Sequence, residues 1–271
     1  MNNNHESYDS YAAWQQKEHQ ETFSLWDKLS TKTLIKRCYD FNEFQLYKEI
    51  VGHKECQTIS DIGCATGGFY RFFKATWPDI NYTGFDISDN ALEKAQARYP
   101  SGTFKKYNSH ISSDIIFCRD VVHHQTEPGA FLENLYDAAE RYLIIRIRTR
   151  EEGTTVFDPN ISCQYTYNHW VPYIVFNTQE LISLIESFNP APTNISIRRN
   201  PIVLGGNVGR YLPKELYYPE TGTSETAILI EKNGAQSSSE PTMIRNDIAV
   251  ERNDQYPFLY KLAKFIAKRI L

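Results

Sequence analysis

The chain has 271 residues, 41% of them hydrophobic and 14% aromatic, which is enough apolar material for one large core with appended segments. A formal net charge of −4 provides no overall positive field to hold a polyanion, so no nucleic acid is expected as a partner. The five cysteines include no Cys-x-x-Cys pair, which argues against a disulfide framework and against a metal site. These properties favour a cytoplasmic protein.

The first part of the chain, residues 1–53, has apolar residues at mixed three- and four-residue spacing, which predicts a cap of two or three helices. Three aromatic residues, Tyr8, Tyr11 and Trp14, stand near its start. Two interpretations are open for them: they fold over a bound ligand, or they pack into the core.

Between residues 54 and 232, short apolar runs alternate with helical stretches, which is the order of a parallel sheet with helices on both faces. The sequence therefore predicts an α/β fold with a doubly wound, mostly parallel seven-stranded sheet that ends in a late hairpin. A helix is predicted over Thr178–Phe188. The predicted strands are Thr58–Ile62, Tyr82–Phe85, Thr103–Tyr107, Asp114–Cys118, Leu143–Ile147, Ile195–Arg199 and Ala227–Glu231.

Two segments interrupt or follow this pattern. Residues 151–177 are rich in Tyr, Trp, Pro and Asn without a clean period, which predicts an insertion after the fifth strand that could serve as a lid. Residues 233–255 begin with Asn-Gly-Ala-Gln-Ser-Ser-Ser-Glu-Pro and are expected to be a linker.

The C-terminal segment, residues 256–271, has the pattern of a basic amphipathic helix. Its four basic residues are Lys261, Lys264, Lys268 and Arg269. Two interpretations are open: peripheral contact with the inner face of an anionic membrane, or docking of the apolar stripe on this domain or on a second subunit of a homodimer. The apolar stripe consists of Phe258, Leu259, Leu262, Phe265, Ile266 and Ile270.

The most informative segment is an apolar strand, a glycine-containing turn and a helix, and its turn has the spacing Asp61-x-Gly63-x-Ala65-x-Gly67. Glycines here allow the backbone to turn sharply and to approach a ligand closely. Because position 65 is Ala, the dinucleotide pattern Gly-x-Gly-x-x-Gly is absent, which argues against NAD or FAD.

Two later segments add to this turn. Asp86 ends the next predicted strand about 20 residues further on, where a carboxylate can accept both hydroxyls of a ribose. Residues 114–124, Asp-Ile-Ile-Phe-Cys-Arg-Asp-Val-Val-His-His, predict a fourth strand that ends in charged and polar residues.

In this order, the three segments resemble the motifs of class I S-adenosylmethionine-dependent methyltransferases, with Ala65 in place of the middle glycine of motif I. The resemblance covers roughly residues 58–149 and, through the order of strands, extends to Glu231. It implies a Rossmann-like fold and S-adenosyl-L-methionine as the cofactor.

The resemblance also implies roles for single residues. The glycine turn would line the methionine end of the cofactor, Asp86 would bind the ribose, and the end of the fourth strand would border the sulfonium. In place of the acidic residue with which the family binds adenine, this chain has Asn108. The implied cofactor-binding residues are Asp61, Gly63, Cys64, Ala65, Gly67, Asp86, Ile87, Asn108, Asp120 and Val121.

Methyl transfer is an in-line displacement that often requires removal of one proton from the acceptor. His123 and His124 follow the fourth strand, where a base could act, and His123 is slightly favoured. The alternative is that either histidine caps a helix or forms hydrogen bonds within the fold.

Arg119, Arg146 and Arg148 are predicted near the carboxyl ends of two central strands, where open α/β sheets bind ligands. They are candidates for binding a carboxylate or phosphate of the substrate. The alternative is internal pairing with Asp120, Glu151 or Glu152.

The insertion adds Tyr165 and His169 as candidates for contact with a sugar, an aromatic ring or a peptide. The prediction is therefore a methyltransferase that modifies an oxygen or nitrogen of a small molecule, with an acidic sugar or a lipid-linked glycan intermediate as the favoured type of substrate. The alternatives are a peptide or protein methyltransferase and a catalytically silent cofactor-binding partner.

Overall fold

The structure is a computed structural model that describes residues 10–16, 26, 28–108, 110–201, 223–232 and 244–249. Several predictions concern residues outside these ranges. They include Tyr8, the side chain of Tyr11, most of the predicted linker 233–255 and the whole C-terminal segment 256–271.

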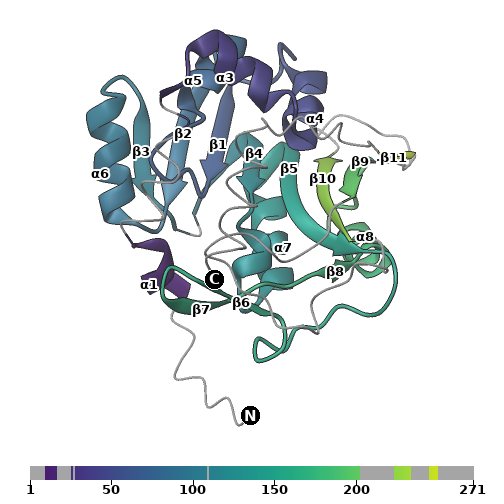
Figure 1. The fold of residues 1–271 in the computed structure, drawn as a ribbon. Helices are drawn as coiled ribbons and strands as arrows, with labels where there is room; N and C mark the ends of the chain where they lie inside the picture. The colour runs from purple at the N-terminus through teal and green to yellow at the C-terminus, as the bar shows by residue number, and fades with distance from the viewer. Residues whose placement is uncertain are drawn as a thin grey trace.

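The described strands form one large sheet in the order β11-β9-β10-β5-β4-β1-β2-β3, with β8 beside β5 as its ninth strand (Figure 1). The neighbouring pairs β3–β2, β2–β1, β1–β4 and β4–β5 are parallel, whereas β10 is antiparallel to both β5 and β9. This arrangement confirms the predicted doubly wound, mostly parallel α/β sheet. The strands are β1 Thr58–Ile62, β2 Asn81–Asp86, β3 Thr103–Lys106, β4 Ser113–Arg119, β5 Ala139–Arg150, β8 Phe176–Asn177, β9 Asn194–Pro201, β10 Ser224–Glu231 and β11 Ile244–Ala249.

Two strands extend the sheet beyond the seven that were predicted. β8 lies within the predicted insertion and pairs with the end of β5. β11 lies within the predicted linker 233–255 and pairs in parallel with β9, so the linker prediction is wrong for Ile244–Ala249. Both strands lie at edges or ends of the sheet, where pairing with an existing strand can stabilise a short segment that has no marked apolar pattern.

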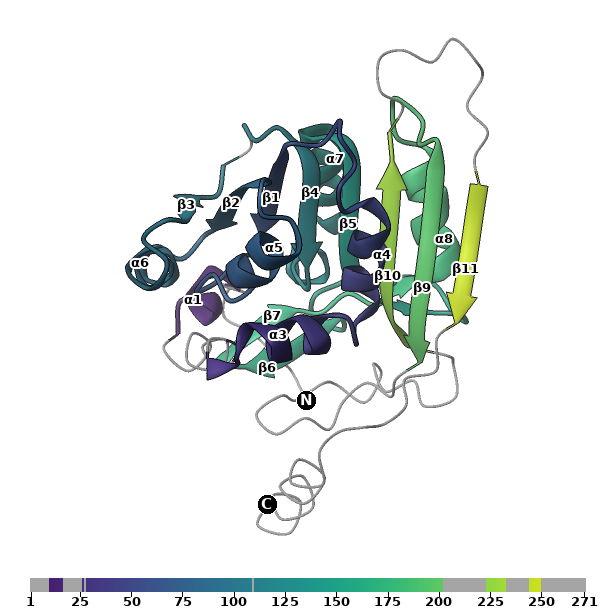
Figure 2. The ribbon, with the colours of Figure 1, turned by 90° about the horizontal axis from the view of Figure 1, so that it is seen from above.

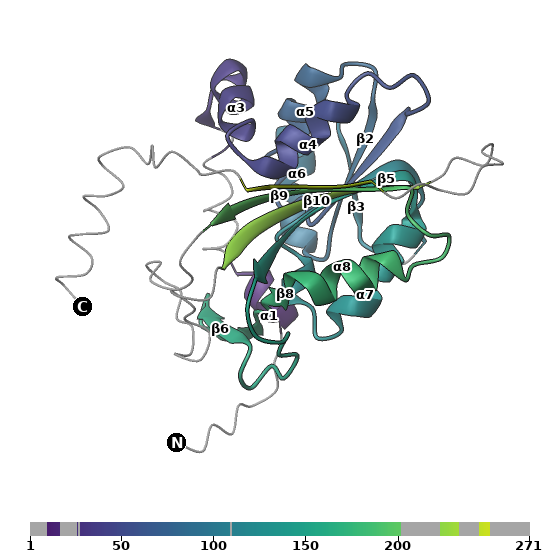
Figure 3. The same cartoon turned by 90° about the vertical axis from the view of Figure 1, so that its right-hand side faces the viewer.

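Helices cover both faces of the sheet (Figure 3). α3 Thr31–Cys38, α4 Asn42–Ile50 and α5 Tyr70–Thr76 pack on one face, and α7 Pro128–Ala138 and α8 Thr178–Glu186 pack on the other. α6 Asp89–Arg98 connects β2 to β3. The predicted helical cap is present as α3, α4 and the short α1 Ser10–Trp14.

The central strands are buried on both faces because helices lie above and below them. Successive residues of β5 alternate between the two cores: Ile144 packs under α4 and α5, and Ile145 packs under α7 and α8. Phe44 of α4 is fully buried and contacts rings of α5 and β4. A charged side chain near the ends of these strands must therefore either pair within the fold or reach a cleft.

The insertion contributes a small hairpin beside α1 (Figure 1). β6 Cys163–Thr166 pairs with β7 His169–Pro172 across the two-residue loop Tyr167-Asn168. Both loop residues have positive φ, 49° and 63°, the requirement of a type I′ turn that matches the twist of a hairpin. Within the described part of the chain, no helix is long and apolar enough to cross a membrane.

Candidate active site

The glycine turn follows β1 and leaves the sheet with three residues in the left-handed region: Gly63 (φ 80°), Ala65 (φ 48°) and Gly67 (φ 75°). The amides of Gly63 and Cys64 both donate to the carbonyl of Phe85 at the end of β2. A Cβ added at Gly63 would lie 2.4 Å from Cγ2 of Val121, so only glycine fits between the turn and the residue after β4.

A pocket of about 200 Å³ opens beside this turn, at the carboxyl ends of the parallel strands. It brings together residues from the glycine turn, from the ends of β2, β4 and β5, and from α1. Its lining consists of Trp14, Asp61, Ile62, Gly63, Ala65, Phe69, Asp86, Ile87, Tyr107, Arg119, Asp120, Val121, His123, His124, Gln125, Phe131 and Arg148.

Asp86 connects the turn to the end of β2. Its two carboxylate oxygens accept the amides of Ala65 (2.8 Å) and Ser88 (2.9 Å). Burial raises the pKa of Asp86, while hydrogen bonds from the amides of Ser88, Ala65 and Ile87 and the charge of Lys106 oppose that shift. A carboxylate offers about four lone-pair positions, so the three amides do not use them all.

Asp61 also lines the pocket and is 2% exposed. Tyr82 donates its hydroxyl to Asp61 at 2.8 Å. Burial raises the pKa of Asp61 to about 7; this hydrogen bond and the charge of Arg119 oppose the shift, and the charge of Asp86 adds to it. A cation placed beside Asp61 would favour its ionised form.

Three aromatic residues of the pocket, Phe69, Tyr107 and Phe131, were not predicted as site residues. Tyr107 follows β3 and Phe131 belongs to α7, and their ring centroids lie 5.8 Å apart. Tyr107 directly follows a parallel strand, and Phe131 lies near the start of a helix that follows one. Ligands of open α/β sheets bind at such positions, so this placement could have indicated a role in the pocket. Tyr107 and Phe131 offer flat apolar surface to a planar ring between β3 and α7.

Three residues predicted to bind the cofactor do not line the pocket: Cys64, Gly67 and Asn108. A Cβ at Gly67 would meet the ring of Phe104 at 2.8 Å, so this glycine permits packing against β3. The side chain of Asn108 accepts the amide of His110 in a local turn.

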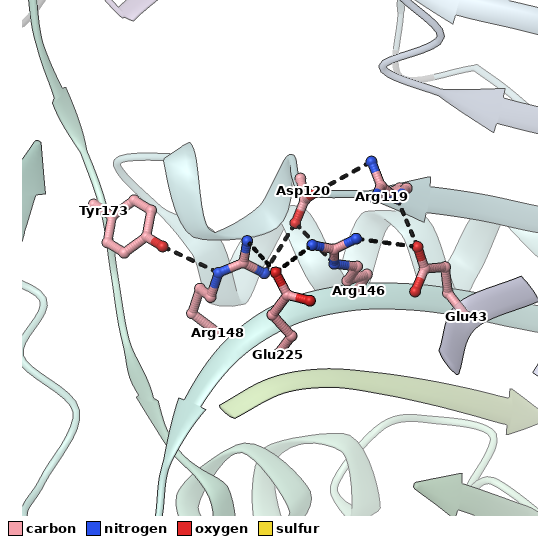
Figure 4. A network of polar contacts seen from close by, with 7 residues as sticks. All are labelled: Glu43, Arg119, Asp120, Arg146, Arg148, Tyr173 and Glu225. Carbon is pink, nitrogen blue, oxygen red and sulfur yellow. Dashed lines mark hydrogen bonds and ion pairs between the residues drawn. The ribbon is translucent and has the colours of Figure 1, made fainter. Parts of the chain in front are cut away.

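The three predicted arginines form a network with three carboxylates and Tyr173 (Figure 4). Asp120 lies at its centre, with φ of 59°, and receives ion pairs from Arg148 (3.1 Å), Arg146 (3.4 Å) and Arg119 (3.4 Å). Burial opposes ionisation of Asp120, but the three arginines hold its pKa well below the usual range.

Glu43 of α4 and Glu225 of β10 complete the network. Glu43 accepts Nε of Arg119 at 2.6 Å and Nη1 of Arg146 at 3.3 Å. Glu225 accepts Nη2 of Arg146 at 2.6 Å and lies 3.3 Å from Nη2 of Arg148. With three arginines and three carboxylates, the formal charges of this network cancel.

This arrangement separates the roles of the arginines. Arg119 and Arg148 reach the pocket lining, whereas Arg146 does not. All three side chains pair internally with Asp120, as in the alternative considered from the sequence. Their other carboxylate partners are Glu43 and Glu225 rather than the expected Glu151 and Glu152, and Glu151 pairs with Arg199 instead.

The two histidines both line the pocket, with their ring centroids 4.1 Å apart and their planes tilted by 47°. Nδ1 of His124 lies 2.8 Å from the carbonyl of Pro172, which can only accept, so this nitrogen carries a proton; in the neutral ring, Nε2 would then carry the lone pair. His123 is 1% exposed, and its Nδ1 has no hydrogen-bond partner among the described residues. Burial, together with His124 and Arg148, holds the pKa of His123 well below its usual value.

Trp14 of α1 closes the pocket over the histidines, with its ring 4.6 Å from that of His124. Nε2 of His169 on β7 lies 3.2 Å from Nε2 of Gln16, which follows α1. His169 thus contacts the segment that covers the pocket rather than the pocket itself, and Tyr165 is 39% exposed on β6. Neither residue lines the pocket.

Comparison with known proteins finds similarity to methyltransferases over part of the chain. Residues 60–141 match a family described as "Methyltransferase domain". Among curated proteins, the chain is 30% identical over 105 residues to the tRNA U34 carboxymethyltransferase of Campylobacter jejuni subsp. doylei, covering 35% of this chain and 36% of the relative. That of Campylobacter lari is 27% identical over 119 residues, 40% of each chain. The chain thus matches well under half the length of these relatives.

Two solved structures share the fold. Magnesium protoporphyrin IX methyltransferase from Synechocystis PCC 6803, with bound SAM, has 14% identity and a TM-score of 0.51 over 83% of this chain and 99% of its own. Phosphoethanolamine N-methyltransferase 2 of Haemonchus contortus, in complex with S-adenosyl-L-methionine, has 12% identity and a TM-score of 0.56 over 83% of this chain and 60% of its own.

The network generates a prediction about Arg146. Arg146→Met would leave two arginines facing three carboxylates, with Glu43 only 2% exposed, so we expect a loss of about 3–5 kcal/mol in the free energy of unfolding. Urea denaturation measures it. Arg198→Met is the matched control, because it removes an arginine paired with the 43% exposed Glu49 and should cost less than about 1 kcal/mol. Equal losses in the two variants would contradict a central role for the network.

Proposed function

We propose that this chain, which carries a class I S-adenosylmethionine-dependent methyltransferase domain, transfers the methyl group to an oxygen or nitrogen atom of a small, uncharged acceptor group. The observation that carries the proposal is the pocket itself: a close-approach turn, two strand-end aspartates and a histidine with a defined lone pair meet in one cavity.

The cofactor half of the pocket has the donors and acceptors that S-adenosylmethionine needs. Asp86 keeps lone pairs toward the pocket for the ribose hydroxyls, and Asp61 is a carboxylate for the ammonium of the methionine part. Tyr107 and Phe131 would contact the adenine ring. The acidic residue with which the family binds adenine is absent, because Asn108 stands in its place. S-adenosylmethionine supplies a methyl group that its sulfonium activates for displacement.

We assign the role of base to His124 rather than to His123. Pro172 holds the proton on Nδ1 of His124, which leaves Nε2 as the acceptor for a proton from the methylated atom. His123 has a strongly lowered pKa and is therefore the weaker base. Trp14, stacked on His124, would limit the access of water to the reacting atoms.

The acceptor group is proposed to be uncharged because the arginine network carries no excess positive charge. An anionic group at Arg148 would compete with Asp120 and Glu225 for the same guanidinium. An acidic sugar, the type of substrate expected from the sequence, is the alternative, and its anionic group would have to displace one of these internal partners. A tRNA or peptide substrate, and a silent cofactor-binding role, are the competing proposals.

One experiment separates these proposals. The full chain is incubated with S-adenosylmethionine and, in parallel, with small-molecule, RNA and protein fractions of a cell extract, and release of S-adenosylhomocysteine is measured. Turnover with the small-molecule fraction is expected. Turnover only with RNA or protein would contradict the small acceptor, and cofactor binding without turnover in any fraction would favour the silent partner.

The raised pKa of Asp61 predicts that cofactor binding depends on pH. Below its pKa of about 7 the empty site holds a neutral carboxyl, which must lose its proton to pair with an ammonium. Lowering the pH from about 7.5 to about 5.5 should therefore weaken S-adenosylmethionine affinity at least ~10-fold by calorimetry. Asp61→Asn is the control, because an amide does not titrate and its weaker affinity should change little over this range. The same pH slope in both proteins would contradict the assignment.

The assignment of the base predicts different effects of the two histidines. The assay uses the acceptor that the experiment with the extract fractions yields. With it, His124→Ala should lower kcat by about 10²–10⁴-fold while S-adenosylmethionine affinity stays within a few-fold. His123→Ala should lower kcat less. If the larger loss belongs to His123→Ala, the roles are reversed, and if neither variant loses more than a few-fold, proton removal by this pair is not part of the reaction.

A further inference from the structure

The insertion carries an exposed apolar surface. Among the residues that the structure describes, the large hydrophobic side chains that are exposed are Phe157 (51%), Ile161 (41%) and Tyr165 (39%). We call these three the insertion surface. Two of them rest against rings of the same segment, Phe157 on Phe176 at 6.0 Å and Tyr165 on Trp170 at 5.4 Å. Large apolar side chains concentrated in one exposed stretch indicate a contact surface.

The same segment is acidic. Residues 151–177 contain Glu151, Glu152 and Asp158 and no lysine or arginine. All three acidic residues are exposed. A partner for this surface should therefore combine apolar side chains with positive charge.

The topology brings the end of β11 to this segment. Ala249 of β11 is in register with Arg199 of β9, and Arg199 forms an ion pair with Glu151, the first residue after β5. Figure 2 shows the arrowheads of β9 and β11 pointing toward the end of the molecule where β6 and β7 lie. The chain that continues from Ala249 therefore starts at the edge of the sheet that carries the insertion and the pocket.

The residues that follow β11 have the complementary sequence. Residues 256–271 carry the basic residues Lys261, Lys264, Lys268 and Arg269, no acidic residue, and an apolar stripe at helical spacing. The nine residues from Ala249 to Phe258 can extend over roughly 30 Å, so the distance to the insertion surface does not limit contact.

We propose that residues 256–271 bind in cis to the insertion, with their apolar stripe against Phe157, Ile161 and Tyr165 and their basic residues near Glu151, Glu152 and Asp158. The occupant is this chain's own segment rather than an anionic membrane, because the acidic residues at the same edge would repel anionic lipid. This contact is independent of the proposed reaction.

Hydrogen–deuterium exchange of the full chain tests the proposal on peptides from residues 256–271. Ile161→Ser removes part of the insertion surface, and Phe265→Ser removes part of the stripe. Each should speed exchange in 256–271 by about 10-fold or more, because an undocked short helix is only marginally stable in water. Tyr260→Ser is the matched control, since Tyr260 lies outside the stripe and should leave exchange unchanged.

The outcomes are distinguishable. Protection that is lost in both stripe and surface variants, and that does not depend on protein concentration, supports the contact in cis. Protection that grows with concentration would assign the segment to a second copy of the chain and overturn the proposal. Protection that appears only with phosphatidylserine-containing vesicles would assign it to a membrane, and equal exchange in all four proteins would show that no contact forms.

Discussion

The neutralisation of three arginines at the ends of two buried strands is the constraint that organises this protein. β4 and β5 are covered on both faces, so Arg119, Arg146 and Arg148 obtain their partners from elements far away in the sequence. Glu43 comes from the N-terminal helices and Glu225 from the late strand β10. The network therefore joins the helical cap, the sheet and, through Tyr173, the insertion. Buried ion pairs of this kind add little net stability, because the cost of desolvating the charges offsets much of their attraction. Their main effect is to fix how the cap, the sheet and the insertion are placed relative to one another.

The network also shapes the reactive part of the pocket. Asp120, at its centre, takes a left-handed backbone conformation that non-glycine residues rarely adopt, and it directs Val121 against Gly63. The position of Val121 beside the glycine turn therefore depends on the ion pairs that hold Asp120, the residue before it. Sequence could predict that the arginines share a face, since Arg146 and Arg148 are two residues apart on a strand. It could not predict their partners, because Glu43 lies 103 residues from Arg146 and Glu225 lies 79 residues from it.

The parts of the fold that sequence predicts well are those with local causes. β4 contains the continuous apolar run Ile115–Cys118, and β1 and β2 are short segments of apolar and small polar residues between turn signals. The glycine turn has a spacing that few other structures require. β8 and β11 depend on pairing with strands that are already in place, and they have no local pattern that would distinguish them from loops. The pair of Tyr107 and Phe131 was missed for a related reason, since an aromatic residue near a strand end is far more often core than ligand wall.

A carboxylate held in an apolar setting without a cation has a consequence for the protein in the cell. Asp61 is buried, and its ionised form near neutral pH opposes folding while the site is empty. A ligand that brings an ammonium to this position removes that penalty in the folded state alone, so the folded population depends on ligand concentration. Chains that lack ligand would open more often and meet proteases sooner.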